Sequence, residues 1–177
     1  MNIRIHDQTF TPFIAAEVIE ARVNAIAAQI DHDYAGKRPL VIGILNGSFI
    51  FAADLLRCLS IEVEISFIKL ASYKGTSSTG HVVTAIGLEE TIKDRHIIIV
   101  EDIIDTGKTL HSFLPEIYNR QPASVAIAAF LTKPEALKYD VKAHYCAFTI
   151  ENKFVVGYGL DYDGLGRNLR GLYVVKE

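Results

Sequence analysis

Three runs of hydrophobic residues, at residues 40–45, 97–100 and 125–131, recur along the 177-residue chain, and each is followed by a polar turn. Uninterrupted hydrophobic runs of this length are typical of strands buried on both faces of a sheet. Helical or irregular segments separate them, and strands alternating with helices predict a Rossmann-like parallel sheet flanked by helices, an α/β fold. The predicted strands cover residues 40–45, 97–101, 125–131 and 145–149.

Three segments have the spacing or the end signals of helices. Thr11-Pro12 has the hydroxyl and proline that often begin a helix, and the hydrophobic residues that follow lie on one helical face as far as Ile30. A second helix is predicted from Phe49, with Ser48 as its N-cap. A third is predicted from Thr109 to Arg120, where Pro115 should cause a kink or a late start.

The rest of the pattern predicts shorter strands and one polar loop. Residues 63–67 alternate between hydrophobic and polar, and a strand is expected to return over residues 82–88. Between them lies a polar, glycine-rich loop at residues 72–80, which we interpret as a lid with Ser72 and Tyr73 at its base. Short strands are also expected at residues 155–160 and 172–175. The organisation is one domain over residues 1–177, with a core of about 11–150 and a small hood formed by about 1–10 and 151–177.

Composition narrows the class of protein. Half of the residues are hydrophobic and 22% are charged, and Lys+Arg 18 against Asp+Glu 21 leaves a net charge of −3, which argues against a general nucleic-acid surface. Hydrophobic runs stay shorter than the roughly 18 residues of a membrane span, so no membrane partner is expected. The N-terminus lacks a signal-peptide pattern, and Cys58 and Cys146 lie in hydrophobic surroundings typical of reduced core residues. These features predict a cytoplasmic protein.

Residues 96–110 carry the strongest chemical signal. Glu101 and Asp102 come at the end of the buried run, and the turn Asp105-Thr106-Gly107-Lys108-Thr109 leads to the third predicted helix. Ligands of open α/β sheets bind at the carboxyl ends of the strands, and backbone amides at a helix start can hold a phosphate. The two carboxylates would repel phosphate, but they suit sugar hydroxyls or a hard divalent cation. The stretch therefore predicts a ribose-phosphate site.

Other chemistries fit the sequence poorly. A P-loop would need glycine where Asp102 stands, and a dinucleotide fingerprint starting at Gly157 would need glycine where Tyr162 stands. The six histidines and two cysteines are scattered without zinc spacing, and Gly47-Ser48 lacks the flanks of a nucleophile elbow.

Several segments in order resemble the purine phosphoribosyltransferases, in particular their hypoxanthine-guanine branch. Residues 100–110 are similar to the family's motif for 5-phosphoribosyl-1-pyrophosphate (PRPP), and residues 45–49 to its pyrophosphate loop. Residues 72–73 resemble the base of its lid. Lys133 falls where the family has its base-recognising lysine, and residues 154–162 with Arg167 resemble its C-terminal purine and pyrophosphate segment. The resemblance implies the type I phosphoribosyltransferase fold.

It also implies an activity: Mg²⁺-dependent transfer of 5-phosphoribosyl from PRPP to hypoxanthine or guanine, giving IMP or GMP and pyrophosphate in purine salvage. Asp105 would be the general base toward purine N7, and Lys133 would donate to the 6-oxo oxygen. Phe154 would stack on the purine and the Val155 backbone would read its edge. The turn of Asp105, Thr106, Gly107, Lys108 and Thr109 would hold the 5′-phosphate.

The remaining implied roles concern charge. Glu101 and Asp102 would hold the ribose hydroxyls and magnesium, and Asp161 a second magnesium. Asn46, Gly47 and Arg167 would hold pyrophosphate, although Asn46 replaces the lysine or arginine common in the family. The family tends to have a non-proline cis peptide in this loop, which we place at Asn46–Gly47.

Three alternatives or open points remain. The enzyme could prefer xanthine, since the purines differ at the 2-position, which a backbone-lined pocket reads without a diagnostic side chain. A PRPP-sensing regulator on the same fold is a second alternative, disfavoured by the net charge. The family suggests a homodimer or a homotetramer, and the sequence does not choose.

Overall fold

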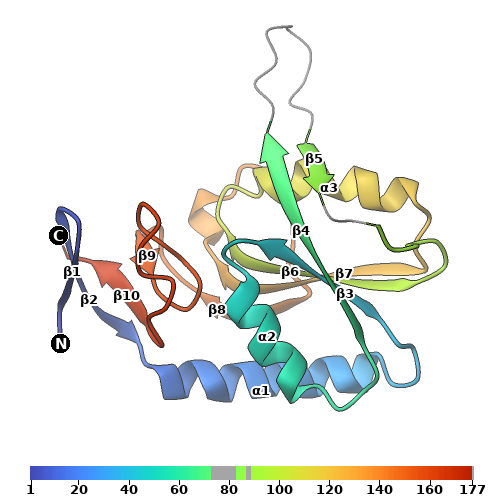
Figure 1. The fold of residues 1–177 in the computed structure, drawn as a ribbon, viewed down its shortest axis with the longest axis horizontal. Helices are drawn as coiled ribbons and strands as arrows, with labels where there is room; N and C mark the ends of the chain where they lie inside the picture. The colour runs from blue at the N-terminus through green and yellow to red at the C-terminus, as the bar shows by residue number, and fades with distance from the viewer. Residues whose placement is uncertain (73–82, 87–88, 177) are drawn as a thin grey trace, which may run out of the picture.

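The computed structural model describes residues 1–72, 83–86 and 89–176, and its larger sheet forms the centre of the molecule (Figure 1). The strand order is β5-β4-β3-β6-β7-β8. Neighbouring strands pair in parallel from β4 to β8, and β5 returns antiparallel to β4 at the edge. This confirms the predicted α/β fold with a parallel sheet. The strands are β3 (Leu40–Leu45), β4 (Glu64–Ser72), β5 (Val83–Ile86), β6 (His96–Ile104), β7 (Ser124–Thr132) and β8 (Tyr145–Thr149).

Helices cover both faces of this sheet. Alternate residues of β6 belong to two separate hydrophobic clusters, because successive side chains of a strand point to opposite faces. One cluster contains the inner faces of α1 (Ala16–Asp33) and α2 (Phe49–Cys58), and the other that of α3 (Lys108–Asn119). Figure 1 shows α1 and α2 together, with α3 across the sheet from them.

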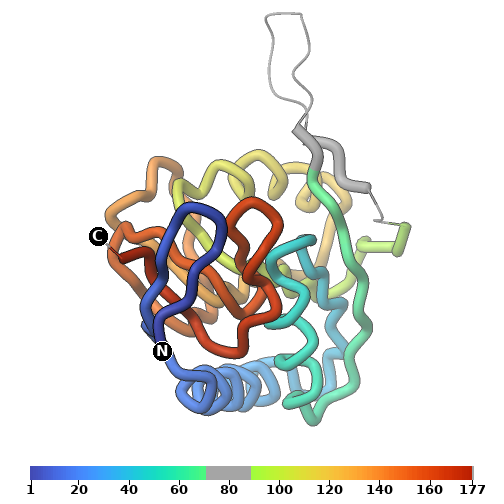
Figure 2. Tube along the Cα trace, turned by 60° about the vertical axis from the view of Figure 1, so that its left-hand side comes forward, coloured from blue at the N-terminus to red at the C-terminus, as the bar shows by residue number. Residues whose placement is uncertain are grey.

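The two ends of the chain form a second, antiparallel sheet beside the first. Its strand order is β1-β2-β10-β9, and both termini lie in this part of the molecule (Figure 2). Phe10 and Val156 are fully buried in its small core, with Ile5 beside them. A hood formed by terminal segments is therefore present, as predicted. Its strands are β1 (Ile3–Ile5), β2 (Gln8–Ile14), β9 (Val155–Val156) and β10 (Leu172–Val175).

The predicted helix start at Thr11-Pro12 is wrong. Both residues lie in β2, where Thr11 pairs with Val174 and Pro12 with Tyr173, and α1 begins only at Ala16. Proline cannot donate a backbone hydrogen bond, and it is tolerated here beside a shift in the β2–β10 register. Pairing with a strand more than 150 residues away overrides the local signal, which no short-range pattern could reveal.

Other predicted elements were placed correctly but with different ends. The strand expected over residues 155–160 stops at Val156, because the next three residues all have positive φ. Strand β6 continues past the expected residue 101 to Ile104, since Ile103 and Ile104 extend the pairing with β7. Helix α3 begins at Lys108 rather than late, and it runs through Pro115.

Candidate active site

Glu101 and Asp102 lie within the last residues of β6, at the carboxyl end of the sheet. Glu101 pairs in register with Ala129 of β7, whereas the register passes over Asp102. Glu101 is 7% exposed, and its Oε2 atom is buried without a hydrogen-bond partner. Burial, followed by the nearby charge of Asp102, raises the pKa of Glu101 well above its ordinary value. Burying a carboxylate oxygen without a hydrogen-bond partner costs free energy of folding, unless a ligand supplies the missing partner.

A divalent cation fits this pair of carboxylates. Within the described ranges, no group of three histidine, cysteine or acidic side chains is arranged to hold a metal ion by itself. Magnesium commonly uses one or two protein carboxylates, with the remaining ligands coming from water and substrate phosphates. Glu101 and Asp102 could therefore hold the ion together with water and a bound substrate.

The turn after β6 forms a hollow of about 270 Å³ lined by residues 101–110. Gly107 has φ +78° and precedes the first residue of α3, so the free amides of the helix start face this turn. The carbonyl of Thr106 accepts hydrogen bonds from the amides of Lys138 and Tyr139, which brace the turn from outside. The predicted phosphate site from Asp105 to Thr109 is thus one continuous concave turn.

Lys133 lies beside Asp105, one of the residues that line this hollow. Lys133 follows β7, is 6% exposed, and has its Nζ atom 3.6 Å from Oδ2 of Asp105. Its backbone amide donates to the carbonyl of Ile104, which fixes the lysine next to the end of β6. The side chain of Asp105 remains 49% exposed and so is open to a ligand. Two residues predicted from segments 28 positions apart in the chain are therefore adjacent.

The predicted pyrophosphate loop, residues 45–49 after β3, packs against both Asp102 and the C-terminal segment. A side chain on Gly47 would collide with the carboxylate of Asp102, and one on Gly159 would collide with the carbonyl of Gly47. Gly159 has φ +103°, which also favours glycine. The cis peptide is Leu45–Asn46, one bond before the predicted Asn46–Gly47. Asn46 is exposed and Gly47 is buried.

Arg167 joins this arrangement through Gly159. Its Nη1 atom donates to the carbonyl of Gly159 over 2.6 Å, and the amide of Gly159 donates to the carbonyl of Arg167 over 3.0 Å. Its Nη2 atom forms an ion pair with Oδ1 of Asp161 at 2.7 Å. The other oxygen of Asp161 accepts the amide of Gly164. Asp161 would have to exchange one of these partners to bind a metal ion.

The predicted purine-binding residues Phe154 and Val155 belong to the hood. Phe154 is 46% exposed, and its ring lies 6.2 Å from that of Phe10 and 5.6 Å from that of Tyr162, between centroids. Val155 is buried in β9, where it pairs with Val174. The exposed ring of Phe154 can therefore stack on a ligand while its contacts with Phe10 and Tyr162 keep it in place. Of the lid residues, Ser72 ends β4 and Tyr73 lies outside the described residues.

A family model for the phosphoribosyl transferase domain matches residues 14–163 of the chain. The chain belongs to the phosphoribosyltransferase family. It is 44% identical over 162 residues to a hypoxanthine-guanine phosphoribosyltransferase from Streptococcus pneumoniae, covering 91% of this chain and 89% of the relative. It is 38% identical over 160 residues to a hypoxanthine-guanine-xanthine phosphoribosyltransferase from Tritrichomonas foetus, covering 90% and 87%.

Solved structures agree with this membership. A hypoxanthine-guanine phosphoribosyltransferase from Bacillus anthracis superposes with a TM-score of 0.86 at 36% identity, covering 94% of this chain and 98% of the other. The predicted fold and the resemblance to the hypoxanthine-guanine branch are confirmed. The chain is therefore an enzyme of the phosphoribosyltransferase class. Within the described residues, no helix is long and hydrophobic enough to span a membrane.

Some features of this phosphoribosyltransferase site have no signal in the sequence. Ser48 was predicted to cap α2, but its hydroxyl donates to the carbonyl of Ile44 and makes no cap bond. The backbone amides of Lys138 and Tyr139 donate hydrogen bonds to the carbonyl of Thr106 from a segment without regular secondary structure. A hydrophobic periodicity in the sequence does not reveal such contacts. The Gly157-x-Gly159 spacing was visible, but only the folded structure brings Gly159 onto Gly47.

Proposed function

We propose that the chain transfers the 5-phosphoribosyl group of PRPP to hypoxanthine or guanine in purine salvage, forming IMP or GMP and pyrophosphate. The observation that carries this proposal is the 3.6 Å separation of Lys133 Nζ and Asp105 Oδ2. In a 6-oxopurine, O6 and N7 lie side by side on one edge of the base. A buried ammonium and a carboxylate this close can address both atoms at once.

The chemistry of the two residues is complementary. Lys133 donates a hydrogen bond to O6, and Asp105 accepts the proton of N7 while N9 forms its bond to C1′ of the ribose. The C1′–oxygen bond breaks at the same time, and its electron pair leaves with pyrophosphate. Adenine presents an amino group in place of O6, so the buried lysine would face a donor and lose its partner. Mismatches of this kind can discriminate by about 10⁴-fold or more.

The remaining residues hold PRPP. The turn from Asp105 to Thr109 binds the 5′-phosphate through backbone amides and hydroxyls, and Glu101 and Asp102 accept hydrogen bonds from the ribose hydroxyls. Arg167 and the backbone of Asn46-Gly47 bind the leaving pyrophosphate. Glu101, Asp102 and, on the pyrophosphate side, Asp161 would hold magnesium, which supplies positive charge to the leaving group. Phe154 stacks on the purine, and the backbone of Val155 reads its edge.

A xanthine-accepting enzyme is the second candidate, favoured by the 38% identity to the Tritrichomonas foetus relative. The decisive experiment measures kcat/KM for hypoxanthine, guanine, xanthine and adenine with PRPP and magnesium. We expect high values for hypoxanthine or guanine and a negligible value for adenine. A higher value for xanthine would favour the second candidate. No transfer to any purine, together with RNA retention in a filter-binding assay, would favour the PRPP-sensing regulator.

Asp105→Asn tests the assigned base. The amide retains the size of the carboxylate but cannot accept the N7 proton, so we expect kcat to fall by about 10²- to 10⁴-fold. The Kd for PRPP, measured by calorimetry without purine, should change far less. Asp94→Asn is the matched control, because Asp94 is exposed at the turn before β6, at the opposite end of that strand. Unchanged turnover in Asp105→Asn would exclude the general-base role.

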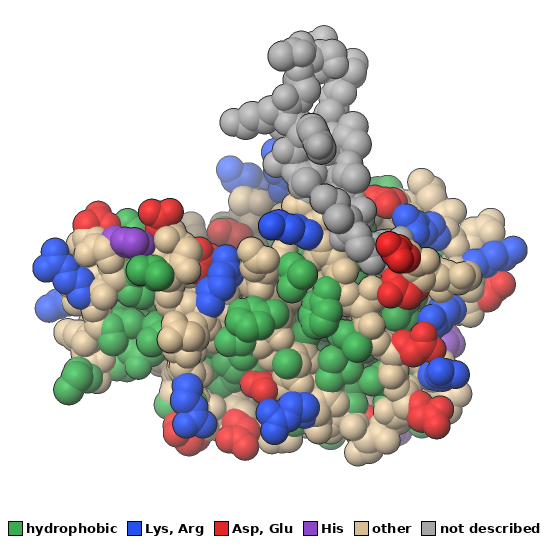
Figure 3. Space-filling view, viewed as in Figure 1, with side chains coloured by type: hydrophobic (Ala, Val, Ile, Leu, Met, Phe, Trp, Pro, Cys, Tyr) green, Lys and Arg blue, Asp and Glu red, His purple; other side chains and the backbone are tan. Residues whose placement is uncertain are grey.

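We also infer a cytoplasmic homodimer or homotetramer. Phe49, Ile65 and Phe67 are among the large hydrophobic side chains that remain exposed, and exposed hydrophobic patches often mark contacts between proteins. Figure 3 shows hydrophobic side chains gathered over α2 and the neighbouring strands, ringed by charged groups. Sedimentation velocity of the purified chain would give the oligomeric state directly.

A further inference from the structure

The turn at residues 157–159 carries a buried tyrosine in an uncommon conformation. Gly157, Tyr158 and Gly159 have φ values of +106°, +47° and +103°. A positive φ is unfavourable for a bulky residue such as tyrosine, so other contacts must hold Tyr158 in place. Its amide donates to the carbonyl of Leu169, and its ring centroid lies 4.6 Å from that of Phe130.

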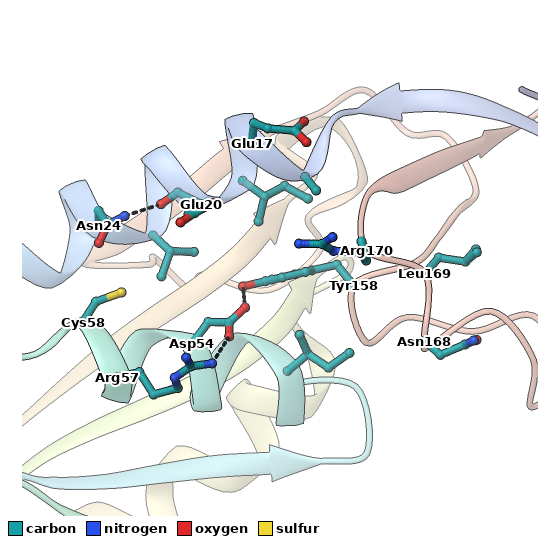
Figure 4. Close-up of a pocket in the computed structure, with 14 residues that line it drawn as sticks. Glu17, Glu20, Asn24, Asp54, Arg57, Cys58, Tyr158, Asn168, Leu169 and Arg170 are labelled. Atoms are coloured by element: carbon teal, nitrogen blue, oxygen red, sulfur yellow. Dashed lines mark hydrogen bonds and ion pairs between the residues drawn. The ribbon is translucent and has the colours of Figure 1, made fainter.

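The hydroxyl of Tyr158 reaches α2. It donates a hydrogen bond of 2.8 Å to Oδ2 of Asp54, as the dashed line in Figure 4 shows. Burial, followed by this hydrogen bond, raises the pKa of Tyr158, so the phenol keeps its proton and remains a donor at neutral pH. The pair lines a cavity of about 540 Å³ between α1, α2 and residues 168–170. None of the roles assigned above uses Asp54 or Tyr158.

The two residues join the elements that form the pyrophosphate end of the site. Asp54 belongs to α2, which begins two residues after Gly47. Tyr158 directly precedes Gly159, whose backbone packs against the carbonyl of Gly47 and exchanges two hydrogen bonds with Arg167. A shift of Tyr158 would therefore move Gly159 and Arg167 away from the pyrophosphate loop. The hydrogen bond to Asp54 opposes this shift by tying the turn to α2.

We propose that Asp54 and Tyr158 are positioning residues for pyrophosphate, holding the turn of Gly159 and Arg167 against the Asn46-Gly47 loop. Neither residue touches the reacting atoms. This inference rests on the proposed function, which assigns pyrophosphate to that loop and to Arg167. It implies a selective effect, because Lys133 follows β7 and Phe154 precedes β9, so both purine residues lie outside the turn at residues 157–159.

Tyr158→Phe tests the proposal by removing one hydroxyl and keeping the ring against Phe130. Since a net hydrogen bond contributes on the order of 1 kcal/mol, we expect the KM for PRPP and the Kd for magnesium pyrophosphate to rise roughly fivefold. The KM for the purine should stay within about a factor of two, on the same reasoning. Calorimetric binding of magnesium pyrophosphate gives a readout independent of turnover.

Tyr145→Phe is the matched control. Tyr145 is also buried, and its hydroxyl donates to Oδ2 of Asp33 over 2.7 Å, joining the amino end of β8 to the last residue of α1. The chemistry lost is the same, but this end of the sheet is opposite the site. Thermal melting should show similar costs for the two variants, while only Tyr158→Phe should weaken PRPP and pyrophosphate.

Variants of Asp54 separate positioning from charge. Asp54→Asn keeps an oxygen that can accept the hydrogen bond from the tyrosine hydroxyl, so this variant should retain a near-normal KM for PRPP. Asp54→Leu cannot accept that hydrogen bond and should resemble Tyr158→Phe. The double variant Asp54→Leu/Tyr158→Phe should be no worse than Asp54→Leu alone, since both single variants remove the same hydrogen bond and Asp54→Leu also removes the 4.0 Å ion pair of Asp54 with Arg57.

The wild-type enzyme is assayed first, because its failure to transfer phosphoribosyl to any purine would count against the proposed function whatever the variants do. With an active wild type, the expected result is loss of PRPP and pyrophosphate affinity in Tyr158→Phe and Asp54→Leu alone. Wild-type affinity in Tyr158→Phe would overturn the inference. So would an equal loss in Tyr145→Phe, or an equal rise in the KM for the purine.

Discussion

Glu101 combines deep burial with a carboxylate oxygen that has no partner, an arrangement that serves ligand binding at the expense of stability. Its pKa is raised above the ordinary value of 4.5, first by burial and then by Asp102. The folded chain therefore keeps a proton that the unfolded chain releases. By linkage, the free energy of unfolding falls as pH rises from about 4.5 through the raised pKa.

Glu101→Gln should consequently stabilise the free protein at neutral pH, because glutamine has no proton to lose. The gain should vanish below pH 4.5 and grow as the pH rises, by about 1.4 kcal/mol for each unit by which the pKa is raised. Urea unfolding across this range measures it, with Glu62→Gln on an exposed position as the control. Glu101→Gln should also bind PRPP and magnesium more weakly. A destabilisation that is equal at every pH would contradict this account.

At this scale, sequence reasoning named the candidate site residues but could not predict how they are arranged in space. Glu101, Asp102 and Asp105 could be predicted because two acids and a glycine turn follow a buried strand directly. Lys133 was predicted only through resemblance, and its separation of 3.6 Å from Asp105 depends on the parallel pairing of β6 with β7. The contact of Asp54 with Tyr158 joins residues 104 positions apart and left no local trace.

At the scale of elements, the C-terminal turn and the pyrophosphate loop depend on each other through two glycines. Gly159→Ala introduces a methyl group that collides with the carbonyl of Gly47, besides placing alanine at φ +103°. We expect the KM for PRPP to rise roughly tenfold, because the loop must leave its present position between Asp102 and Gly159. Steady-state kinetics with varied PRPP measure this effect.

Gly36→Ala separates collision from backbone strain. Gly36 has φ +71°, but a side chain there meets nothing within 4 Å, and it lies in the turn between α1 and β3. Both variants should lose roughly 1 kcal/mol of stability through the positive φ. Only Gly159→Ala should lose affinity for PRPP. Equal kinetic effects would show that strain rather than contact matters.

Element prediction succeeded where hydrophobic runs were long and failed where distant pairing decided the structure. The buried strands β3, β6 and β7 were found because residues covered on both faces must be continuously hydrophobic, whereas the edge strand β8 alternates between buried and partly exposed residues. Pro12 shows the opposite case, since its place in β2 follows from pairing with β10 at the other end of the chain. The local sequence around Pro12 predicts a helix start, and only the pairing of β2 with β10 in the folded hood explains its place in a strand.

At the scale of the whole molecule, the stacking residue for the purine and the residues for ribose phosphate are assigned to different sheets. The ribose and 5′-phosphate residues and Lys133 lie at the large sheet, and Phe154 lies on the hood beside Phe10. Phe10 is fully buried and packs against both Phe154 and Tyr162, whose hydroxyl also donates to Asp7 in the β1–β2 turn. The N-terminal hairpin thus supports the stacking face for the base.

Phe10→Leu should therefore weaken purine binding without weakening PRPP binding. The smaller side chain leaves Phe154 with less support, so we expect the KM for hypoxanthine to rise severalfold and stability to fall by about 1 kcal/mol or more. Ile30→Val in α1 is the control, because Ile30 is equally buried and the loss in stability should be about 0.5–1.5 kcal/mol. Calorimetric titration with PRPP should give the wild-type Kd for both variants. If Phe10→Leu weakened PRPP as much as hypoxanthine, the two sheets would act as one binding unit, and the separation of purine and ribose-phosphate sites between them would be wrong.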